Sequence, residues 1–535
     1  MSAAASDQTG RIARSAGAVG IAVFCSRILG LIREQVLANL FGAGTAMDAF
    51  VVAFRIPNLL RDLFAEGALS AAFVTVFTDY DERWGRARTW RLANVVLAVL
   101  TLLVGAIALV GIFASDKLVR LMAPDFALVP GKTGLTVIMT QIMFPFLPMI
   151  SLAAVVMGIL NAKGKFFVPA MASTFFNLGS IVSGVALAMI LPRYGVPAII
   201  GMAVGTLLGG GLQLAVQTPL LFRVGYRFQW VIDWRDEGLR RILRLMTPAI
   251  IGLSATQINV FINTFFASSC AEGSVAWLNY AFRLLQFPIG VFGVAISIAA
   301  MPVVSRYASQ QDHEGLKQAF TSSLVMTLLI TIPASVGLAV LAEPIIALIF
   351  QHGRFSAADT GQTAAALCFY AIGLFAYSGV KVVVPVFYAL NDTRYPVIGS
   401  FLAVGANFLL IILTLSTLQH RAIALATSFS MILNFVFLSS VLYRKVQGYP
   451  LKYVGWCLVK VCLASAIMGL SIHWANAFLQ PLAGAGLVGR LFALLCIITF
   501  GLVVYGFLLR FSKIPEFQEL IKLLQGLGGQ RATRP

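Results

Sequence analysis

The chain has 535 residues, of which 59% are hydrophobic and only 11% charged, whereas about a quarter of the residues of a soluble domain are charged. This composition excludes an ordinary soluble fold and predicts an integral membrane protein. The formal charge of +18 does not indicate nucleic-acid binding, because the basic residues lie between hydrophobic segments and not on one face of a soluble module.

Apolar segments long enough to cross a bilayer recur from Ser15 to Arg510, with short polar breaks between them. Because a spanning helix needs about 20 mostly apolar residues, they predict an all-α membrane protein with about fourteen transmembrane helices. The polar stretch from Met1 to Arg14 lacks the pattern of a cleaved signal peptide, so we expect the first helix to be retained. The predicted spans are 15–41, 47–79, 89–114, 134–160, 167–191, 195–222, 240–269, 274–305, 318–342, 360–390, 395–416, 420–443, 453–476 and 487–509.

Lys and Arg are distributed unevenly over the breaks between these spans. If the N-terminus is cytoplasmic, most of them fall in cytoplasmic segments. The positive-inside rule therefore predicts that both termini lie in the cytoplasm. The basic residues that then fall in outer segments are Lys117, Arg120, Lys132, Arg193, Arg354, Arg421 and Arg490.

The second half of the chain repeats the first weakly. Ala53-Phe54-Arg55 recurs as Ala281-Phe282-Arg283, and Leu160-Asn161 recurs as Leu390-Asn391, at an offset of about 227 to 230 residues. Six spans fall within one period, which predicts two six-helix lobes of the same orientation; the alternative is chance similarity between apolar segments. The predicted parts are an N-terminal lobe at 1–225, a C-terminal lobe at 226–445, two further helices at 446–512 and a cytoplasmic tail at 513–535.

Eight charged residues are crowded into the first two spans. If they faced lipid, inserting them would cost on the order of 20 kcal/mol, so we expect them to face protein or water. Residues seven apart share a face of a helix, which aligns Asp48 with Arg55 and Asp62. The eight residues are Arg27, Arg33, Glu34, Asp48, Arg55, Arg61, Asp62 and Glu66.

The cluster holds four arginines and four acids, and Arg283 from the other lobe would bring the arginines to five. Arg27, Arg55 and Arg61, joined by Arg283 from the other lobe, could present planar guanidinium groups to a phosphate. The alternative interpretation is structural, because Glu34, Asp62 and Glu66 could pair with arginines and hold the helices together. Pro57 removes one helical hydrogen bond within this region, so bending or gating is a further hypothesis for it, as for Glu34 and Asp62.

Other chemistry finds little support in the sequence. A nucleotide-binding G-x-x-x-x-G-K-[ST] loop is missing, and the histidines and cysteines do not lie at metal-ligand spacing. We therefore expect no cofactor, no metal and no ATP hydrolysis, with an ion gradient or the membrane potential as the energy source. A membrane glycosyltransferase remains a distant alternative, although its catalytic acid would need a larger outer loop.

Five short motifs lie close together in the first two spans: 26–33 (SRILGLIR), 41–44 (FGAG), 48–50 (DAF), 55–61 (RIPNLLR) and 64–68 (FAEGA). Together they closely resemble the N-terminal signature of the MurJ (MviN) family of lipid II flippases. The resemblance implies membership of the multidrug/oligosaccharidyl-lipid/polysaccharide exporter superfamily and a place in the bacterial inner membrane. It also implies a substrate, the undecaprenyl-pyrophosphate-linked peptidoglycan precursor lipid II, moved from the cytoplasmic to the outer leaflet. An exporter of drugs or of another polyprenyl-linked glycan is the alternative within the same superfamily.

The resemblance further implies roles for single residues. The two C-terminal helices would form a groove for the polyprenyl tail, and the arginine-rich cavity between the lobes would bind the pyrophosphate. Some family members carry an acid immediately before the arginine of the eighth span, where this chain has Phe282. The substrate-binding positions implied are Arg27, Arg33, Asp48, Arg55, Arg61, Glu66 and Arg283.

Family members with a sodium site use carboxylates in the seventh and eleventh spans. This chain has Asn263, Asn407 and Ile411 there, with Thr427 nearby. Because neutral oxygens bind sodium weakly, we expect at most a weak cation site at Asn263, Asn407 and Thr427, and the membrane potential as the driving force. The expected partners are lipid II, membrane lipids and other cell-wall synthesis proteins, and not nucleic acid.

Overall fold

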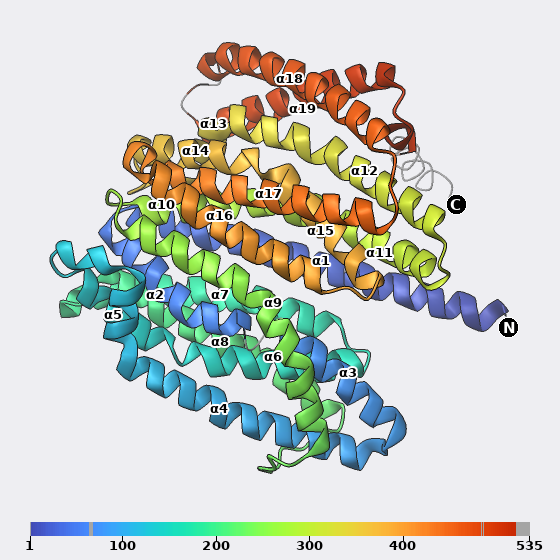
Figure 1. Cartoon of the computed structure of the whole chain (residues 1–535). Coiled ribbons are helices and arrows are strands. Elements are labelled where there is room, and N and C mark those ends of the chain that lie inside the picture. Colours follow the sequence, from blue (N-terminus) through green and yellow to red (C-terminus); the bar gives the residue numbers. More distant parts are fainter. Residues whose placement is uncertain (1, 64–67, 483, 485, 520–535) are drawn as a thin grey trace, which may run out of the picture. The chain divides into compact units, whose positions relative to one another are not determined.

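A computed structural model describes residues 2–63, 68–482, 484 and 486–519. Every regular element within these ranges is a helix, which confirms the predicted all-α fold. The chain divides into two compact units, residues 1–276 and 277–535. Figure 1 shows the helices of each unit in the colours of the sequence.

The first unit holds the helices from α1 to α9 and the start of α10. Two short 3-10 helices, η2 and η3, follow α4 and α7. The bounds are α1 Ser2–Phe41, α2 Thr45–Arg61, α3 Ala68–Arg83, α4 Gly85–Met122, η2 Pro124–Leu128, α5 Lys132–Met143, α6 Phe146–Ala162, α7 Phe167–Ile190, η3 Leu191–Tyr194, α8 Ala198–Arg223 and α9 Glu237–Ser268.

The second unit holds the remaining helices. Within it, α18 packs against α12 and α19, and α19 also packs against α13, so the two C-terminal helices are joined to the rest of this unit through α12 and α13 (Figure 1). The bounds are α10 Ser274–Pro288, η4 Ile289–Gly293, α11 Val294–Ser309, α12 His313–Val340, α13 Ala342–Phe350, α14 Ala357–Ile372, α15 Leu374–Ala389, α16 Arg394–Leu418, α17 His420–Lys445, α18 Leu451–Leu482 and α19 Leu487–Ser512.

Among the described residues, eleven helices are long and apolar enough to cross a membrane, or up to twelve if α14 and α15, bent by 42° at Gly373, form one span. The protein is therefore a multi-pass membrane protein. The predicted spans outside this set are the two that carry the charged cluster, namely α1 and the pair α2 and α3, which flanks residues 64–67. The number fourteen stays a prediction.

The order of helices repeats at the offset seen in the sequence. α2 ends at Arg61, with π-helical geometry at Asp62 and Leu63, and α10 ends at Pro288, where the π-helical turn η4 begins. Residues 144–145 separate α5 from α6, and Gly373 separates α14 from α15. These paired irregularities support the internal repeat. The predicted lobe boundaries follow from the sequence repeat alone and stay predictions, whereas the first compact unit includes α9.

Glycines bring α7 and α8 into backbone contact. A Cβ atom added at Gly201, Gly205 or Gly209 of α8 would lie 2.5 to 2.6 Å from a backbone atom of α7. Small residues at such spacing let membrane helices approach closely without a hydrophobic driving force. The two helices therefore pack as a tight pair within the first unit.

Candidate functional site

The predicted face of α2 begins with Asp48, which is buried with 1% of its surface exposed. Its Oδ2 accepts hydrogen bonds from Lys132 Nζ at 2.8 Å and from the Gly273 backbone N–H at 2.9 Å, and its Oδ1 accepts one from the Ala276 N–H at 3.0 Å. Lys132 is also buried, and its Nζ lies 4.1 Å from the centroid of the Phe126 ring. Asp48 thus ties α2 to α5 and to the turn that follows α9.

A second carboxylate lies at the same end of α2. Glu272 in the turn after α9 accepts hydrogen bonds from the backbone N–H of Thr45, at 2.7 Å, and from the Thr45 hydroxyl. Since the first N–H groups of a helix have no partner inside it, this carboxylate caps α2 from another segment. The two bonds from Thr45 hold the pKa of the Glu272 carboxyl below its ordinary value.

The middle of the face is Arg55, two residues before Pro57. Its Nη1 donates a hydrogen bond of 2.6 Å to Thr264 Oγ1 of α9. The Thr264 hydroxyl in turn donates to the Val260 carbonyl at 2.7 Å, and its side chain is fully buried. The Arg55 guanidinium is therefore held against a buried hydroxyl whose own proton is already committed.

The last member of the face is Asp62, which shares its carboxylate among three neighbours. Arg61 Nη2 donates to Oδ1 at 2.9 Å, while Gln257 of α9 and Asn58 of α2 donate to Oδ2 at 3.3 and 3.4 Å. The side chains of Arg61 and Asp62 keep 20% and 31% of their surface exposed. Glu66, the next acid along the chain, lies outside the described residues.

These contacts set a register between α2 and α9. Asp48, Arg55 and Asp62 are seven residues apart, and their partners Gln257 and Thr264 are also seven apart but met in the opposite order. The two helices therefore run antiparallel with one polar face turned toward each other. α2 stays α-helical through Pro57 to Arg61, and the wider π-helical geometry begins at Asp62 and Leu63.

The predicted residues of α1 divide into one pair and one exposed cation. Arg33 Nη2 lies 3.0 Å from Glu34 Oε1, and the Arg33 guanidinium lies over the Phe176 ring of α7 at 5.4 Å. Glu34 is buried with 3% of its surface exposed, so its neighbour provides the positive charge that a buried carboxylate needs. Arg27, six residues before Arg33 on the same helix, is exposed.

The remaining predicted residues do not all fall in the same unit. Arg283 belongs to the second unit and donates through Nη1 to Gln286 at 3.4 Å, while Phe282 packs on Tyr370 and Tyr377. Thr427 and Asn407 are buried in the second unit, where their side chains share a hydrogen bond of 3.4 Å. Asn263 lies on α9 of the first unit.

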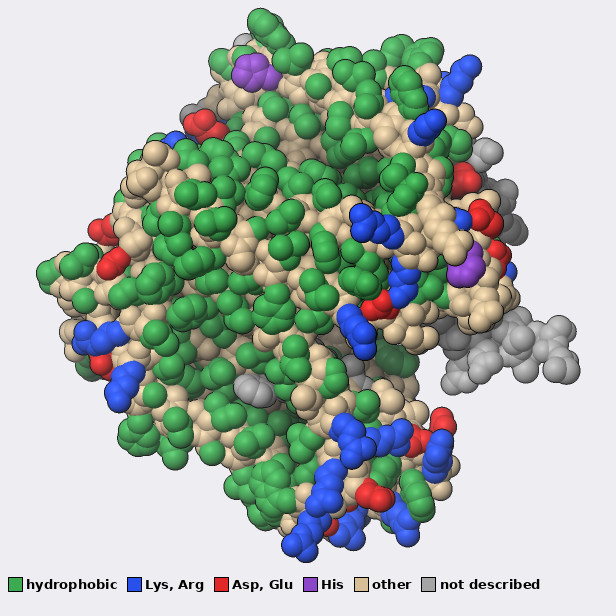
Figure 2. Space-filling model, in the orientation of Figure 1, with side chains coloured by type: hydrophobic (Ala, Val, Ile, Leu, Met, Phe, Trp, Pro, Cys, Tyr) green, Lys and Arg blue, Asp and Glu red, His purple; other side chains and the backbone are tan. Residues whose placement is uncertain are grey.

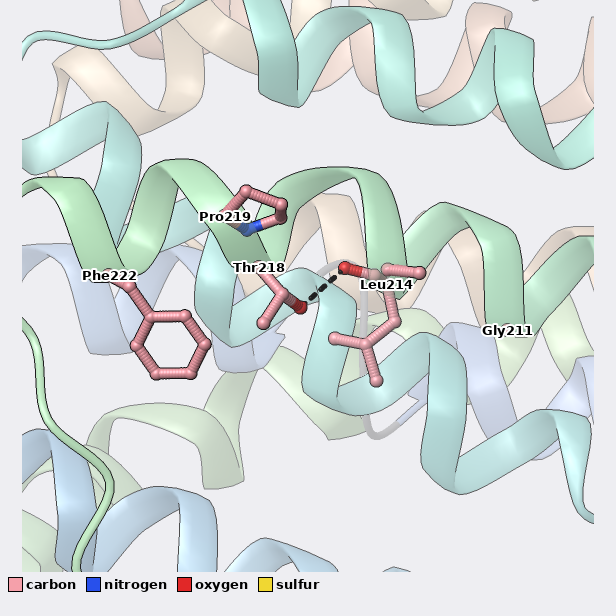
Figure 3. Close-up of a pocket in the computed structure, with 6 residues that line it drawn as sticks. Gly211, Leu214, Thr218, Pro219 and Phe222 are labelled. Carbon is pink, nitrogen blue, oxygen red and sulfur yellow. Dashed lines mark hydrogen bonds between the residues drawn. The ribbon is translucent and has the colours of Figure 1, made fainter.

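The first unit also has an open apolar pocket on α8, shown in Figure 3, with a volume of about 540 Å³. The Thr218 hydroxyl on its wall donates to the Leu214 carbonyl at 2.9 Å, so it offers no free proton to a ligand. None of the predicted site residues lines it. Its lining residues are Gly211, Leu214, Ala215, Thr218, Pro219 and Phe222.

Within the described ranges, His, Cys, Asp and Glu side chains do not gather in any group of three or more that could hold a metal ion. In the first unit the charged groups are guanidinium, ammonium and carboxylate groups on α1, α2 and α5 and in the turn after α9, whereas Arg283 belongs to the second unit. Such an arrangement can bind an anion and can rearrange its own ion pairs, but it provides no evident nucleophile or general base aimed at a substrate.

Comparison with known proteins assigns the family. The model of the family described as lipid II flippase MurJ matches residues 37–496. The chain belongs to the MurJ family. A probable lipid II flippase MurJ of Vibrio cholerae is 33% identical over 502 residues, covering 92% of this chain and 95% of the relative. One of Rhizobium tropici is 35% identical over 473 residues, covering 88% of each.

Solved structures agree with this assignment. A lipid II flippase MurJ in an inward closed conformation matches with a TM-score of 0.78 and 27% identity, covering 94% of this chain and 99% of that one. An inward-facing multidrug transporter of the MATE family and MOP superfamily matches with a TM-score of 0.68 over 79% of this chain, at 17% identity. The second likeness shows that the MurJ and MATE families share this fold.

Sequence reasoning missed the residues that fix the charged face in place. The positive-inside rule places Lys132 in an outer segment, and the structure shows that its side chain is the buried partner of Asp48. Gln257 and Thr264 are neutral residues on a long apolar helix, and neither residue alone indicates a contact with charged side chains. Their spacing of seven, matched to that of Asp48, Arg55 and Asp62, is the pattern that could have revealed them.

Proposed function

We propose that this protein flips lipid II, the undecaprenyl-pyrophosphate-linked peptidoglycan precursor, from the cytoplasmic to the outer leaflet by alternating access. The observation that carries the proposal is the match to the lipid II flippase MurJ family over residues 37–496. It is a transporter and not an enzyme. We further propose that its arginines bind the pyrophosphate, because a guanidinium group meets phosphate with two parallel hydrogen bonds.

The residues proposed for this binding have different surroundings. Arg27 is exposed on α1, and Arg61 and Arg283 lie partly exposed, so all three can reach a ligand without a change of fold. Asp48 is already held by Lys132 and two backbone N–H groups. Its proposed role is therefore to position α2 and the turn after α9, and the direct contacts with the phosphate are assigned to the arginines.

The location and energy source are part of the proposal. We place the protein in the bacterial inner membrane with both termini in the cytoplasm, where the uneven distribution of Lys and Arg favours them. The membrane potential is the proposed driving force, since the chain has neutral side chains at Asn263, Asn407 and Thr427. Dissipation of the potential should stop flipping, whereas replacement of sodium by potassium should leave it unchanged. Cell-wall synthesis proteins are the proposed partners.

The test is replacement of the essential lipid II flippase by this chain in a bacterial depletion strain. We expect growth to be restored and lipid II to appear in the outer leaflet, measured by its accessibility to an externally added lipid II-cleaving enzyme. Export of a different polyprenyl-linked glycan, with no outer-leaflet lipid II, would contradict the assignment if the protein is inserted at normal levels.

Single substitutions separate the arginine hypothesis from the family assignment. Arg27→Ala and Arg283→Ala should each abolish rescue while leaving the amount of inserted protein unchanged. Arg354→Ala, which removes an exposed arginine from the loop after α13, is the matched control and should rescue normally. Normal rescue by both test variants would refute phosphate binding by these residues.

A further inference from the structure

One end of the first unit carries a dense mixture of basic and aromatic side chains. Figure 2 shows blue side chains gathered where the ends of α3, α4 and α9 meet in Figure 1. Residues 79–91, 163–165 and 223–244 together hold twelve Lys and Arg against six Asp and Glu. We refer to these three segments as the basic-aromatic surface.

The centre of this surface is the connection between α8 and α9, which is a built structure and not a loose loop. Asn94 of α4 anchors it with three hydrogen bonds: its Oδ1 accepts from the Tyr226 hydroxyl at 2.6 Å and from the Gln229 N–H at 3.0 Å, and its Nδ2 donates to the Arg227 carbonyl at 3.2 Å. Arg91 adds an ion pair of 3.3 Å with Asp233. The connection is therefore held against α4 along most of its length.

The anchored connection displays apolar side chains on the outside. Phe228, Trp230, Ile232 and Trp234 are alternate residues of the connection and keep 53%, 52%, 46% and 53% of their surface exposed. A fixed row of large apolar groups facing outward is unfavourable in water, so the row needs a partner that is itself partly apolar.

The charges around the row favour an anionic partner. Asp79 is engaged by Arg83 and Arg241, Asp81 by Lys163, and Asp233 by Arg91. Three of the six acids are thus paired inside the surface. Exposed arginines that form no ion pair with any described residue are Arg86, Arg88, Arg223, Arg227, Arg235, Arg240 and Arg244.

The position of the four exposed apolar residues along the chain indicates which partner they meet. The connection joins two helices apolar enough to span a membrane, Ala198–Arg223 and Glu237–Ser268, so it lies where the chain leaves the hydrocarbon. Tryptophan is enriched at that level, with its ring among the headgroups, and arginine binds phosphate there. A soluble protein partner could bind anywhere on an exposed loop, whereas lipid headgroups can be met only next to the spanning helices.

We propose that the basic-aromatic surface is a docking site for anionic phospholipid headgroups, which fix the α8–α9 connection, and with it the start of α9, at the membrane surface. The tryptophans insert between headgroups of any charge. The exposed arginines add selectivity for anionic over zwitterionic lipid, because each basic residue near an anionic surface strengthens attraction by about fivefold.

The experiment uses the full chain purified in detergent and titrated with phosphatidylglycerol or phosphatidylcholine of the same acyl chains, with bound lipid counted by native mass spectrometry. We expect tighter binding of phosphatidylglycerol, and Arg227→Gln/Arg235→Gln should reduce that preference at least about fivefold. Trp230→Ser/Trp234→Ser should weaken the binding of both lipids. Unfolding temperatures of the variants verify that each is folded.

Arg193→Gln/Arg354→Gln removes one exposed arginine from η3 and one from the loop after α13, and is the matched control. It should keep the full preference for phosphatidylglycerol. Equal binding of the two lipids by the unchanged protein would overturn the proposal. So would an equal loss of preference in the control, because it would trace the effect to net charge and not to this surface.

Discussion

The two ends of the α2 face hold their charges in different ways. At the first end, Asp48 is 1% exposed and has three donors within 3.0 Å, one of them the buried Lys132. At the other end, Asp62 is 31% exposed and meets Gln257 of α9 only at 3.3 Å. The same helix face is therefore closed by a buried ion pair at one end and by long, water-accessible hydrogen bonds at the other. The Asp48 end is therefore the closed end of the face, and the Asp62 end is the water-accessible one.

The largest expected effect comes from breaking the buried pair. Asp48→Asn leaves the Lys132 ammonium buried without its counter-charge, which should destabilise the protein by about 3 to 5 kcal/mol. The measurement is the unfolding temperature in detergent. Lys132→Met should do the same, and the double variant should recover part of the loss because neither charge is then stranded.

Asp125→Asn, in the short helix η2 near Lys132, is the control for that comparison and should change the unfolding temperature little. If Asp48→Asn unfolded at the same temperature as this control, the Asp48–Lys132 pair would not stabilise its end of the α2 face more than Asp62 stabilises the other end.

A smaller effect is expected in the middle. Thr264→Val keeps the shape of the side chain but removes the acceptor of the 2.6 Å bond from Arg55. Loss of one hydrogen bond to a charged group should lower the free energy of unfolding by about 1.5 to 3 kcal/mol. Thr256→Val, an exposed threonine of the same helix, should have almost no effect. Equal free energies of unfolding for the two variants would show that the hydrogen bond from Arg55 to Thr264 does not stabilise the contact between α2 and α9.

The smallest effect concerns the cap on α2 and depends on pH. The folded-state pKa of Glu272 lies below its ordinary value of 4.5, so its stabilisation is complete above that value and is lost as the pH falls through the folded pKa. We expect Glu272→Gln to flatten the fall in unfolding temperature below about pH 4.5. Glu343→Gln, at an exposed position, should keep the full slope.

Most of the fold could be predicted because the length of an apolar segment can be read from neighbouring residues alone and indicates a spanning helix. Each predicted span coincides with one helix or with successive helices, and the ends of these helices recur at the repeat offset. Bends within a span were less visible. Gly373 lies in an apolar run, and only the packed structure shows that the chain bends there by 42°.

The site could be predicted only where its charged residues recur at a regular spacing along one helix. Seven-residue spacing placed Asp48, Arg55 and Asp62 on one face, where the structure has them. Their partners come from distant parts of the sequence, and no local pattern links Asp48 with Lys132 or Arg55 with Thr264. Whether the predicted arginines bind substrate stays a prediction, and so does any cation site at Asn263, Asn407 and Thr427.

The glycine contacts between α7 and α8 also have a practical consequence. Backbones that already touch at Gly201, Gly205 and Gly209 cannot slide past one another without a steric clash. Distance probes attached to these two helices should therefore report a constant separation during turnover. The pair can serve as an internal ruler against which the displacement of any other helix is measured.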